Sequence, residues 1–136
     1  MSRDFSRTPV RVVIVDDHRL FVEALALLLG HDERLEVIGT AGDGATAIEL
    51  AVARQAEVAV IDVKMPEIDG LETARRLRKR SPATRVILVT GLDEPQLVDE
   101  AKNAGAVALL QKGALHDQLK EAIVAAAAQS AARDPA

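Results

Sequence analysis

Five polar residues stand at the ends of short apolar runs, and their types could capture a phosphate group. They are Asp16, Asp17, Asp62, Thr90 and Lys112. Three crowded carboxylates repel one another and raise at least one carboxyl pKa unless a cation neutralises them. Oxygen ligands with no thiol or histidine nearby select Mg²⁺ or Mn²⁺, and a site with few protein ligands keeps a position open for phosphate. The residue types therefore predict a divalent-metal site that handles phosphate.

A carboxylate in such a site can act as a nucleophile toward phosphorus. An aspartate that attacks a phosphorus centre forms an acyl phosphate, and the Lys112 ammonium together with the metal ion would neutralise the oxygens of the transferred group. Thr90 would offer its hydroxyl to a phosphoryl oxygen, and Gly91 has no side chain to obstruct the approach. These roles require the polar residues to meet in space.

Strand and helix patterns alternate along the chain in a way that would bring these residues together. Continuous β-branched and apolar runs predict strands, and apolar residues at helical spacing predict helices. The predicted strands cover 10–15, 35–40, 58–61, 85–89 and 107–110, and the predicted helices cover 18–29, 45–54, 71–79, 96–104 and 115–128. Such pairs predict an α/β fold with a parallel sheet, because each crossover must pass over a face of the sheet.

The order of the strands decides whether the polar residues share one edge. In an open parallel sheet, ligands bind beyond the carboxyl ends of the strands, where the strand order reverses. The second strand alone ends without a charged residue, in Thr40-Ala41-Gly42, which suits an outermost position. We therefore predict a five-stranded parallel sheet of order 2-1-3-4-5, flanked by five helices in a three-layer sandwich.

Length and charge exclude several classes of function. The chain of 136 residues fits one domain, and 49% of its residues are hydrophobic, enough for one core. It carries 17 basic and 21 acidic residues, a net charge of −4, so no global field attracts a nucleic acid. Phe5 and Phe21 are its only aromatic residues, too few for base stacking. Direct nucleic-acid binding is not expected.

The same composition bears on the cellular compartment. The chain has no cysteine, which excludes disulfides, thiolate zinc sites and cysteine nucleophiles. Residues 1–9 are polar and lack the apolar region of a signal peptide, and every long apolar stretch carries a charge. We expect a cytoplasmic protein with no export signal and no membrane span.

Four motifs in order along the chain resemble a known family. They are Ile-Val-Asp-Asp-His-Arg-Leu-Phe at 14–21, Asp-Val-Lys-Met-Pro-Glu-Ile-Asp-Gly at 62–70, Val-Thr-Gly at 89–91 and Gln-Lys-Gly at 111–113. Together they resemble the response-regulator receiver domain of two-component signalling over residues 10–128. The first motif is most similar to the NarL/FixJ subgroup. The resemblance implies a CheY-like, flavodoxin-like sandwich.

The resemblance also implies a role for each acid. Asp62 would accept a phosphoryl group from a partner histidine kinase, in a signalling domain and not in a turnover enzyme. Mg²⁺ (or Mn²⁺) would be bound directly by Asp17 and Asp62. Asp16 would hold the ion through water, and the backbone carbonyl of Lys64 would complete the protein ligands.

Two departures from the family pattern affect how phosphorylation would be transmitted. Thr90 and Lys112 would bind the phosphoryl oxygens, but Leu109 stands where receivers usually have the Tyr or Phe that rotates inward with the threonine. Gly113 follows the lysine where proline with a cis bond is common. The chemistry is therefore expected to persist, with a weaker or different readout.

The resemblance divides the chain into an N-terminal extension at 1–9, a receiver domain at 10–128 and a tail or linker at 129–136. Members of the subgroup usually continue into a helix-turn-helix domain that binds DNA and controls transcription. We expect this output domain to be absent from the chain, so that DNA is reached only through it.

A homodimer is a further interpretation, with two candidate surfaces. On the predicted helix 18–29, Val22, Ala26 and Leu29 fall outside the expected core stripe, and Val124, Ala127 and Ala128 do so on the helix 115–128. The fourth and fifth helices with the fifth strand form the other surface. Isolated apolar residues are common on any surface, so the sequence does not choose between these interpretations.

Two alternatives for the whole chain remain open. A phosphatase of the haloacid dehalogenase type also uses an aspartate at a strand end, but it needs a second acid where this chain has Lys64. A phosphate-independent receiver that serves as a protein-interaction module is made plausible by Leu109.

Simpler interpretations stand beside the individual motifs. Asp16 or Asp17 could cap the first helix, which would explain one acid but not three. His18, His31 and His116 lack metal-ligand spacing, and we expect His18 to begin the first helix without a catalytic role. The basic cluster at 75–80 suits a solvated helix end, and the glycines at 39–44 have the wrong offsets for a dinucleotide loop.

Overall fold

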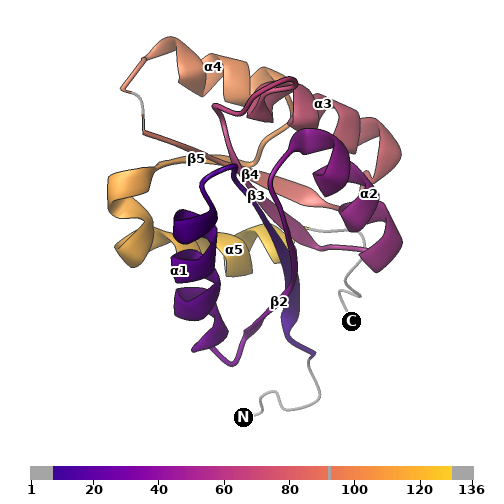
Figure 1. The fold of residues 1–136 in the computed structure, drawn as a ribbon, viewed down its shortest axis with the longest axis vertical. Coiled ribbons are helices and arrows are strands. Elements are labelled where there is room, and N and C mark those ends of the chain that lie inside the picture. The colour runs from indigo at the N-terminus through magenta and orange to yellow at the C-terminus, as the bar shows by residue number, and fades with distance from the viewer. Residues whose placement is uncertain (1–7, 92, 130–136) are drawn as a thin grey trace.

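The computed structural model describes residues 8–91 and 93–129 and contains one sheet of five parallel strands (Figure 1). The strands are β1 (Val10–Val15), β2 (Leu35–Ala41), β3 (Val58–Asp62), β4 (Arg85–Thr90) and β5 (Ala108–Gln111). The helices are α1 (Arg19–Gly30), α2 (Gly44–Arg54), α3 (Gly70–Arg80), α4 (Gln96–Asn103), the 3₁₀ turn η1 (Lys112–Ala114) and α5 (Leu115–Ala127). The strand order is β2-β1-β3-β4-β5, which confirms the predicted order 2-1-3-4-5.

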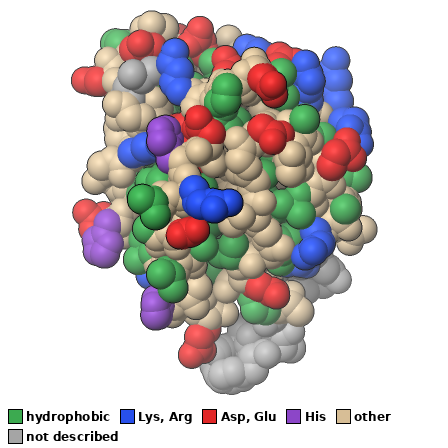
Figure 2. Space-filling view, in the orientation of Figure 1, with side chains coloured by type: hydrophobic (Ala, Val, Ile, Leu, Met, Phe, Trp, Pro, Cys, Tyr) green, Lys and Arg blue, Asp and Glu red, His purple; other side chains and the backbone are tan. Residues whose placement is uncertain are grey.

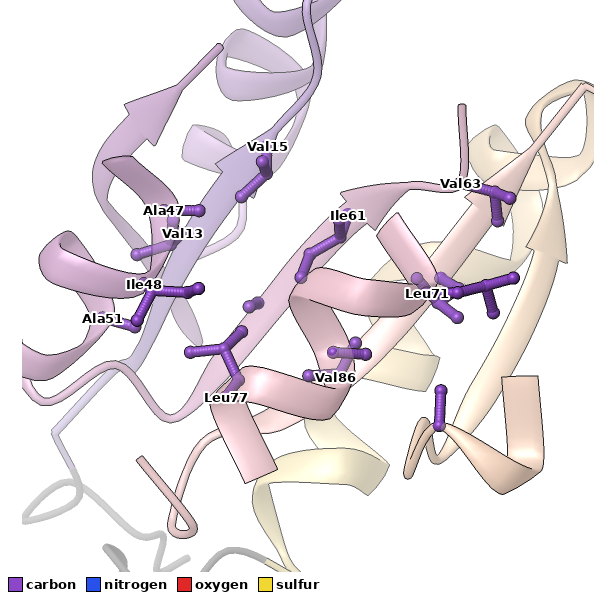
Figure 3. Packing of buried hydrophobic residues seen from close by; sticks show 14 of the residues in the cluster. Val13, Val15, Ala47, Ile48, Ala51, Ile61, Val63, Leu71, Leu77 and Val86 are labelled. Carbon is purple, nitrogen blue, oxygen red and sulfur yellow. The ribbon is translucent and has the colours of Figure 1, made fainter. Parts of the chain in front are cut away.

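The sheet separates two hydrophobic cores, one on each face. Val13, Val15 and Ile61 belong to the core that the sheet forms with α2, α3 and α4, and Figure 3 shows part of this cluster. Val12 and Ile14 alternate with them and belong to the core under α1 and α5. Every residue of β3 is buried, as a strand covered on both faces requires. The apolar runs therefore reflect a sheet enclosed by helices.

Helix α1 buries a different face from the one that its apolar spacing predicts. Its buried residues are Val22, Leu25 and Leu29, whereas Leu20 is 81% exposed and Leu27 is 69% exposed. The expectation that Val22 and Leu29 lie outside the core stripe was therefore wrong. Apolar residues surround most of α1, so the helical period alone selects no single stripe, and the packing against β1 and β2 selects it instead.

Helix α5 corrects the second predicted apolar stripe. Ala127 is buried in the core under the helix, Val124 is half-buried and Ala128 is exposed. The expectation that all three lie off the core was thus wrong for Ala127. The helix has 13 residues, and none of the helices in the described ranges is long and apolar enough to cross a membrane.

Aspartate caps begin the two helices that follow β2 and β3. The Asp43 carboxylate accepts a hydrogen bond from the backbone N of Thr46 at 2.7 Å, and Asp69 accepts one from the backbone N of Glu72 at 2.9 Å. The glycine-rich segment at 39–44 therefore ends a strand and caps a helix. These two roles account for the segment, so no dinucleotide-binding role is needed to explain its glycines.

Candidate functional site

The parallel strands bring the polar residues of interest to one edge of the sheet. Asp16 and Asp17 directly follow β1, Asp62 is the last residue of β3, Thr90 is the last residue of β4, and Lys112 follows β5. Potential ligand atoms of Asp16, Asp17 and Asp62 lie within 4.8 Å of one another, together with a ring nitrogen of His18. The predicted juxtaposition of the three acids is present.

Lys112 lies among these acids as their cation. Its Nζ is 3.0 Å from Oδ2 of Asp16 and 3.6 Å from Oδ1 of Asp62. The same ammonium lies 4.4 Å from the centre of the Phe21 ring, which faces it from α1. Lys112 is therefore held between two carboxylates and an aromatic face.

The surroundings of Asp62 oppose its ionisation. Its side chain is 5% exposed, and this burial is the main cause that raises the pKa of Asp62 above its usual value of 3.8. The neighbouring charge of Asp16 raises the pKa further, as does Asp17, while the ammonium of Lys112 lowers it. A cation bound at this cluster would favour the charged carboxylate.

Asp16 presents an oxygen atom that its neighbours leave without a hydrogen bond. Oδ1 accepts a hydrogen bond of 2.9 Å from the backbone N of His18, whereas Oδ2 accepts none of ordinary geometry from the described residues. The side chain is only 1% exposed, and Oδ2 contacts the ammonium of Lys112. A buried carboxylate oxygen of this kind is suited to a cation or to a water that a cation holds.

The start of α1 argues against the simpler capping interpretation. The N-cap residue is His18, and its side chain caps no backbone N–H of the helix. Asp16 accepts the backbone N–H of His18, one residue before the helix, and potential ligand atoms of both aspartates lie in the acidic cluster. The expectation that His18 begins the helix was right, but the assumption that no histidine lies near the acids was wrong, because the ring of His18 lies among them. Because His18 directly follows Asp17 in the sequence, its nearness to the acids could have been predicted from that adjacency. Looking only for histidines at metal-ligand spacing does not reveal it.

The loop between β3 and α3 is built around a close backbone contact. A Cβ atom at Gly70 would lie 2.2 Å from the backbone oxygen of Asp62, so no larger residue fits there. The backbone N of Gly70 donates to the carbonyl of Val63 at 2.8 Å. Glu67 has a φ of 69°, and the side chain of Lys64 is exposed. Gly70 thereby fixes how the residues after Asp62 turn back over the sheet.

Two further residues lie at the same edge. Thr90 is 1% exposed at the end of β4, beside Gln111 of β5 in the register of the strands. Leu109, at the position of the usual switch aromatic, is half-buried and packs against the core formed with α2, α3 and α4. A Cβ atom at Gly91 would meet no atom of the described residues within 4 Å.

The basic cluster of α3 lies away from the acidic site. Figure 2 shows Lys and Arg side chains gathered over the region where Figure 1 places α3. Arg75 and Arg76 pair with Glu72 at 3.1 and 3.0 Å, and Arg80 pairs with Glu49 at 3.0 Å. These exposed ion pairs at a helix end agree with the interpretation as a solvated, dipole-matched surface.

Comparison with known proteins places this geometry in a family context. The family model of the response regulator receiver domain matches residues 12–124. NarL of Mycobacterium tuberculosis, described as a transcriptional regulatory protein, is 38% identical over 115 residues, which cover 85% of this chain and 53% of NarL. The response regulator GacA of Pseudomonas aeruginosa is 35% identical over 114 residues, which cover 84% of this chain and 53% of GacA. The chain spans about half the length of these curated relatives.

Solved structures agree with the sequence relatives. The signal receiver domain of M. tuberculosis NarL matches with a TM-score of 0.83 and 38% identity, covering 89% of this chain and 98% of that domain. The response regulator domain of CheB from Thermotoga maritima matches with a TM-score of 0.82 and 30% identity, covering 88% of this chain and 96% of that domain. The similarity therefore extends over nearly all of the described fold.

Proposed function

Because this chain belongs to the response regulator receiver domain family of two-component signalling, we propose that Asp62 is its phosphoacceptor and that phosphorylation switches its contacts with partners. One observation carries the proposal. Asp62 ends the central strand β3 at the edge where Asp16, Asp17 and Lys112 converge, with Lys112 Nζ 3.6 Å from its Oδ1. A carboxylate so placed has both an acidic metal-binding cluster and a fixed cation beside it.

The residues at this edge fit a divalent cation. Their ligand oxygens lie close enough to share one ion, and the buried Oδ2 of Asp16 accepts no hydrogen bond of ordinary geometry from the described part of the chain. Asp17 and Asp62 would bind Mg²⁺ (or Mn²⁺) directly, Asp16 would hold it through water, and the backbone carbonyl of Lys64 would complete the protein ligands. When bound, the ion neutralises charge on the phosphoryl group and favours the ionised carboxylate of Asp62.

The protein's own residues carry the transfer step. A carboxylate oxygen of Asp62 attacks the phosphorus atom of a phosphohistidine; the new P–O bond forms as the P–N bond breaks, and the electron pair leaves with the imidazole nitrogen. Lys112 is close enough to Asp62 to pair with an oxygen of the transferred group. The hydroxyl of Thr90 is the other candidate donor to these oxygens. The product is an acyl phosphate on Asp62.

A new dianion at Asp62 would bias an equilibrium between two conformations. Movement of Thr90 toward the phosphoryl group would disturb the end of β4 and the neighbouring strand β5. Leu109 fills the aromatic switch position there, so repacking of a half-buried leucine replaces the inward rotation of an aromatic ring. We expect the signal to appear as altered partner binding or homodimerisation, and not as catalytic turnover.

The partners follow from the family. Receiver domains of this family interact with histidine kinases, and the relatives NarL and DegU are named as transcriptional regulatory proteins. We therefore assign a sensor histidine kinase as the phosphodonor, in the cytoplasm, and a DNA-binding output outside residues 10–128 as the responding element. The chain itself would contact DNA only through that output.

The test is phosphorylation of the isolated chain by a small phosphodonor. We expect phosphoramidate with Mg²⁺ to add one phosphoryl group to the wild type, measured by intact mass spectrometry, and none to Asp62→Asn. Asp117→Asn, which changes an exposed acid in the first turn of α5, is the matched control and should be labelled like the wild type. Labelling of Asp62→Asn to the wild-type extent would exclude Asp62 as the acceptor.

A second candidate function is favoured by Leu109, namely a receiver that binds partners without phosphate. Beryllofluoride separates the two, because it mimics the phosphoryl group without needing a donor. The proposed switch predicts widespread changes in amide NMR shifts around Thr90 and β5 when beryllofluoride and Mg²⁺ are added together. Unchanged spectra and an unchanged oligomeric state would favour the phosphate-independent module.

A further inference from the structure

The ring of His18 lies inside the carboxylate cluster, and the phosphoryl-transfer mechanism gives it no role. Its Nδ1 is 3.0 Å from Oδ1 of Asp16 and 3.5 Å from Oδ1 of Asp17. The imidazole is 68% exposed, so it borders the site from the solvent side. A nitrogen atom that could coordinate a metal ion therefore lies next to the oxygen atoms that would bind Mg²⁺.

The backbone holds the ring in this place. His18 is the N-cap residue of α1 with an extended backbone, and its N–H donates to Oδ1 of Asp16. Its side chain makes no capping hydrogen bond to the helix, so the ring is not engaged by α1. The contacts that position the imidazole thus come from the acids themselves.

The distances allow one ion to lie among Asp17, His18 and Asp62, with Asp16 near enough to hold it through water. The candidate ligand atoms of Asp16, Asp17, His18 and Asp62 lie within 4.8 Å of one another. Opposite ligands of a single cation are about 4 Å apart when each bond is about 2.0–2.2 Å, so small side-chain rotations close the site. The second oxygen of Asp16 is buried and contacts the ammonium of Lys112 at 3.0 Å, so this side of the cluster already faces a positive charge.

The chemistry of the added nitrogen depends on the metal. Mg²⁺ prefers oxygen ligands and gains little from imidazole, whereas Co²⁺, Ni²⁺ and Zn²⁺ bind nitrogen well and follow the Irving–Williams order of affinity. We propose that Nδ1 of His18 is a metal ligand that makes this site bind transition-metal cations of the Co²⁺, Ni²⁺ and Zn²⁺ class more tightly than Mg²⁺. The proposal rests on the metal site of the proposed function and adds a selectivity to it.

The test compares metal affinities of single variants. Isothermal titration calorimetry of the untagged chain measures Ni²⁺ and Mg²⁺ binding for the wild type, His18→Asn and His116→Asn. Asparagine suits an N-cap position, so His18→Asn should keep α1 folded. His116 is an exposed histidine on α5 and serves as the matched control. We expect His18→Asn to bind Ni²⁺ at least about tenfold more weakly than the wild type, with Mg²⁺ affinity nearly unchanged. Mutating a residue that only hydrogen-bonds to a metal ligand already costs about tenfold in metal affinity, so losing a ligand should cost at least as much.

A spectroscopic readout identifies the nitrogen directly. Bound Co²⁺ should give a visible absorption spectrum in the wild type and His116→Asn that changes in His18→Asn. Equal Ni²⁺ affinities in the wild type and His18→Asn, or equal losses for Ni²⁺ and Mg²⁺, would overturn the assignment of His18. The Asp17→Asn variant tests the metal site itself, separately from the role of His18. If the wild type binds no Mg²⁺, or if Asp17→Asn binds Mg²⁺ as tightly as the wild type, the metal site of the proposed function is overturned instead.

Discussion

Nζ of Lys112 lies 3.0 Å from Oδ2 of Asp16, a carboxylate that is 1% exposed. This contact is shorter than the 3.6 Å between Lys112 and Asp62, although Asp62 is the proposed phosphoacceptor. The ion pair links the segment after β5 to the end of β1 and supplies a positive charge to the most buried acid of the cluster. Removing Lys112 would therefore leave the buried carboxylate of Asp16 without its cation.

Replacing Lys112 should make folding depend on magnesium. Lys112→Met leaves Asp16 buried without its cation, and we expect the free energy of unfolding to fall by about 1–3 kcal/mol in the presence of EDTA. Because the proposed Mg²⁺ site exists only in the folded state, Mg²⁺ should restore more stability to this variant than to the wild type. Urea denaturation with and without Mg²⁺ measures both effects. Lys64→Met, at an exposed lysine of the β3–α3 loop, should behave like the wild type in EDTA.

The raised pKa of Asp62 predicts a variant that is more stable than the wild type without metal. The unfolded chain releases this proton near pH 3.8, whereas the folded chain holds it to higher pH because burial and Asp16 disfavour the charge. Stability contributed by Asp62 is therefore lost as the pH rises from 3.8 through the folded pKa. Asp62→Asn should gain about 1–3 kcal/mol at pH 7 in EDTA, the scale of an incompletely compensated buried charge.

The same variant has a pH signature that a general packing effect lacks. The stability difference between Asp62→Asn and the wild type should shrink toward zero as the pH falls well below 3.8, where Asp62 is protonated in both states. Denaturation curves at a series of pH values measure it. A difference that stays constant with pH would show that the charge of Asp62 is not its cause.

Phe21 should be coupled to Lys112 through the ring contact at 4.4 Å. A double-mutant cycle with Phe21→Leu and Lys112→Met isolates this contact from the loss of buried ring surface. We expect a coupling energy of about 0.5–1 kcal/mol, the usual value for a partly exposed cation–π pair. A cycle between Phe21→Leu and Lys64→Met is the control and should be additive.

Gly70 should tolerate no side chain. A Cβ atom there meets the backbone oxygen of Asp62 at 2.2 Å, so Gly70→Ala must move the backbone of β3 or of α3. We expect Gly70→Ala to lower the free energy of unfolding by about 1–3 kcal/mol or more, the cost of overpacking. It should also slow phosphoramidate labelling, because the displaced backbone carries Asp62. Gly42→Ala, which meets no atom within 4 Å, is the matched control in thermal unfolding.

The strands, their order and the acids at one edge of the sheet follow from local patterns. Each apolar run is long enough to cross a covered sheet, and the first charged or hydroxyl residue after it stands where the strand leaves the core. Parallel connections carry all such ends to the same side, so the nearness of Asp17 and Asp62 could be predicted without coordinates. The four motifs around these residues, taken together in their order along the chain, predicted the family.

Other features depend on contacts between segments far apart in the chain, which no local pattern contains. The buried face of α1 is selected by β1 and β2, because apolar residues on most sides of that helix leave the choice to packing. The pairing of Lys112 with Asp16 in preference to Asp62, and the ring of His18 among the acids, arise where two strand ends and a helix start converge. Side-chain distances of 3 to 4 Å depend on how whole elements pack, whereas element type depends on neighbouring residues alone.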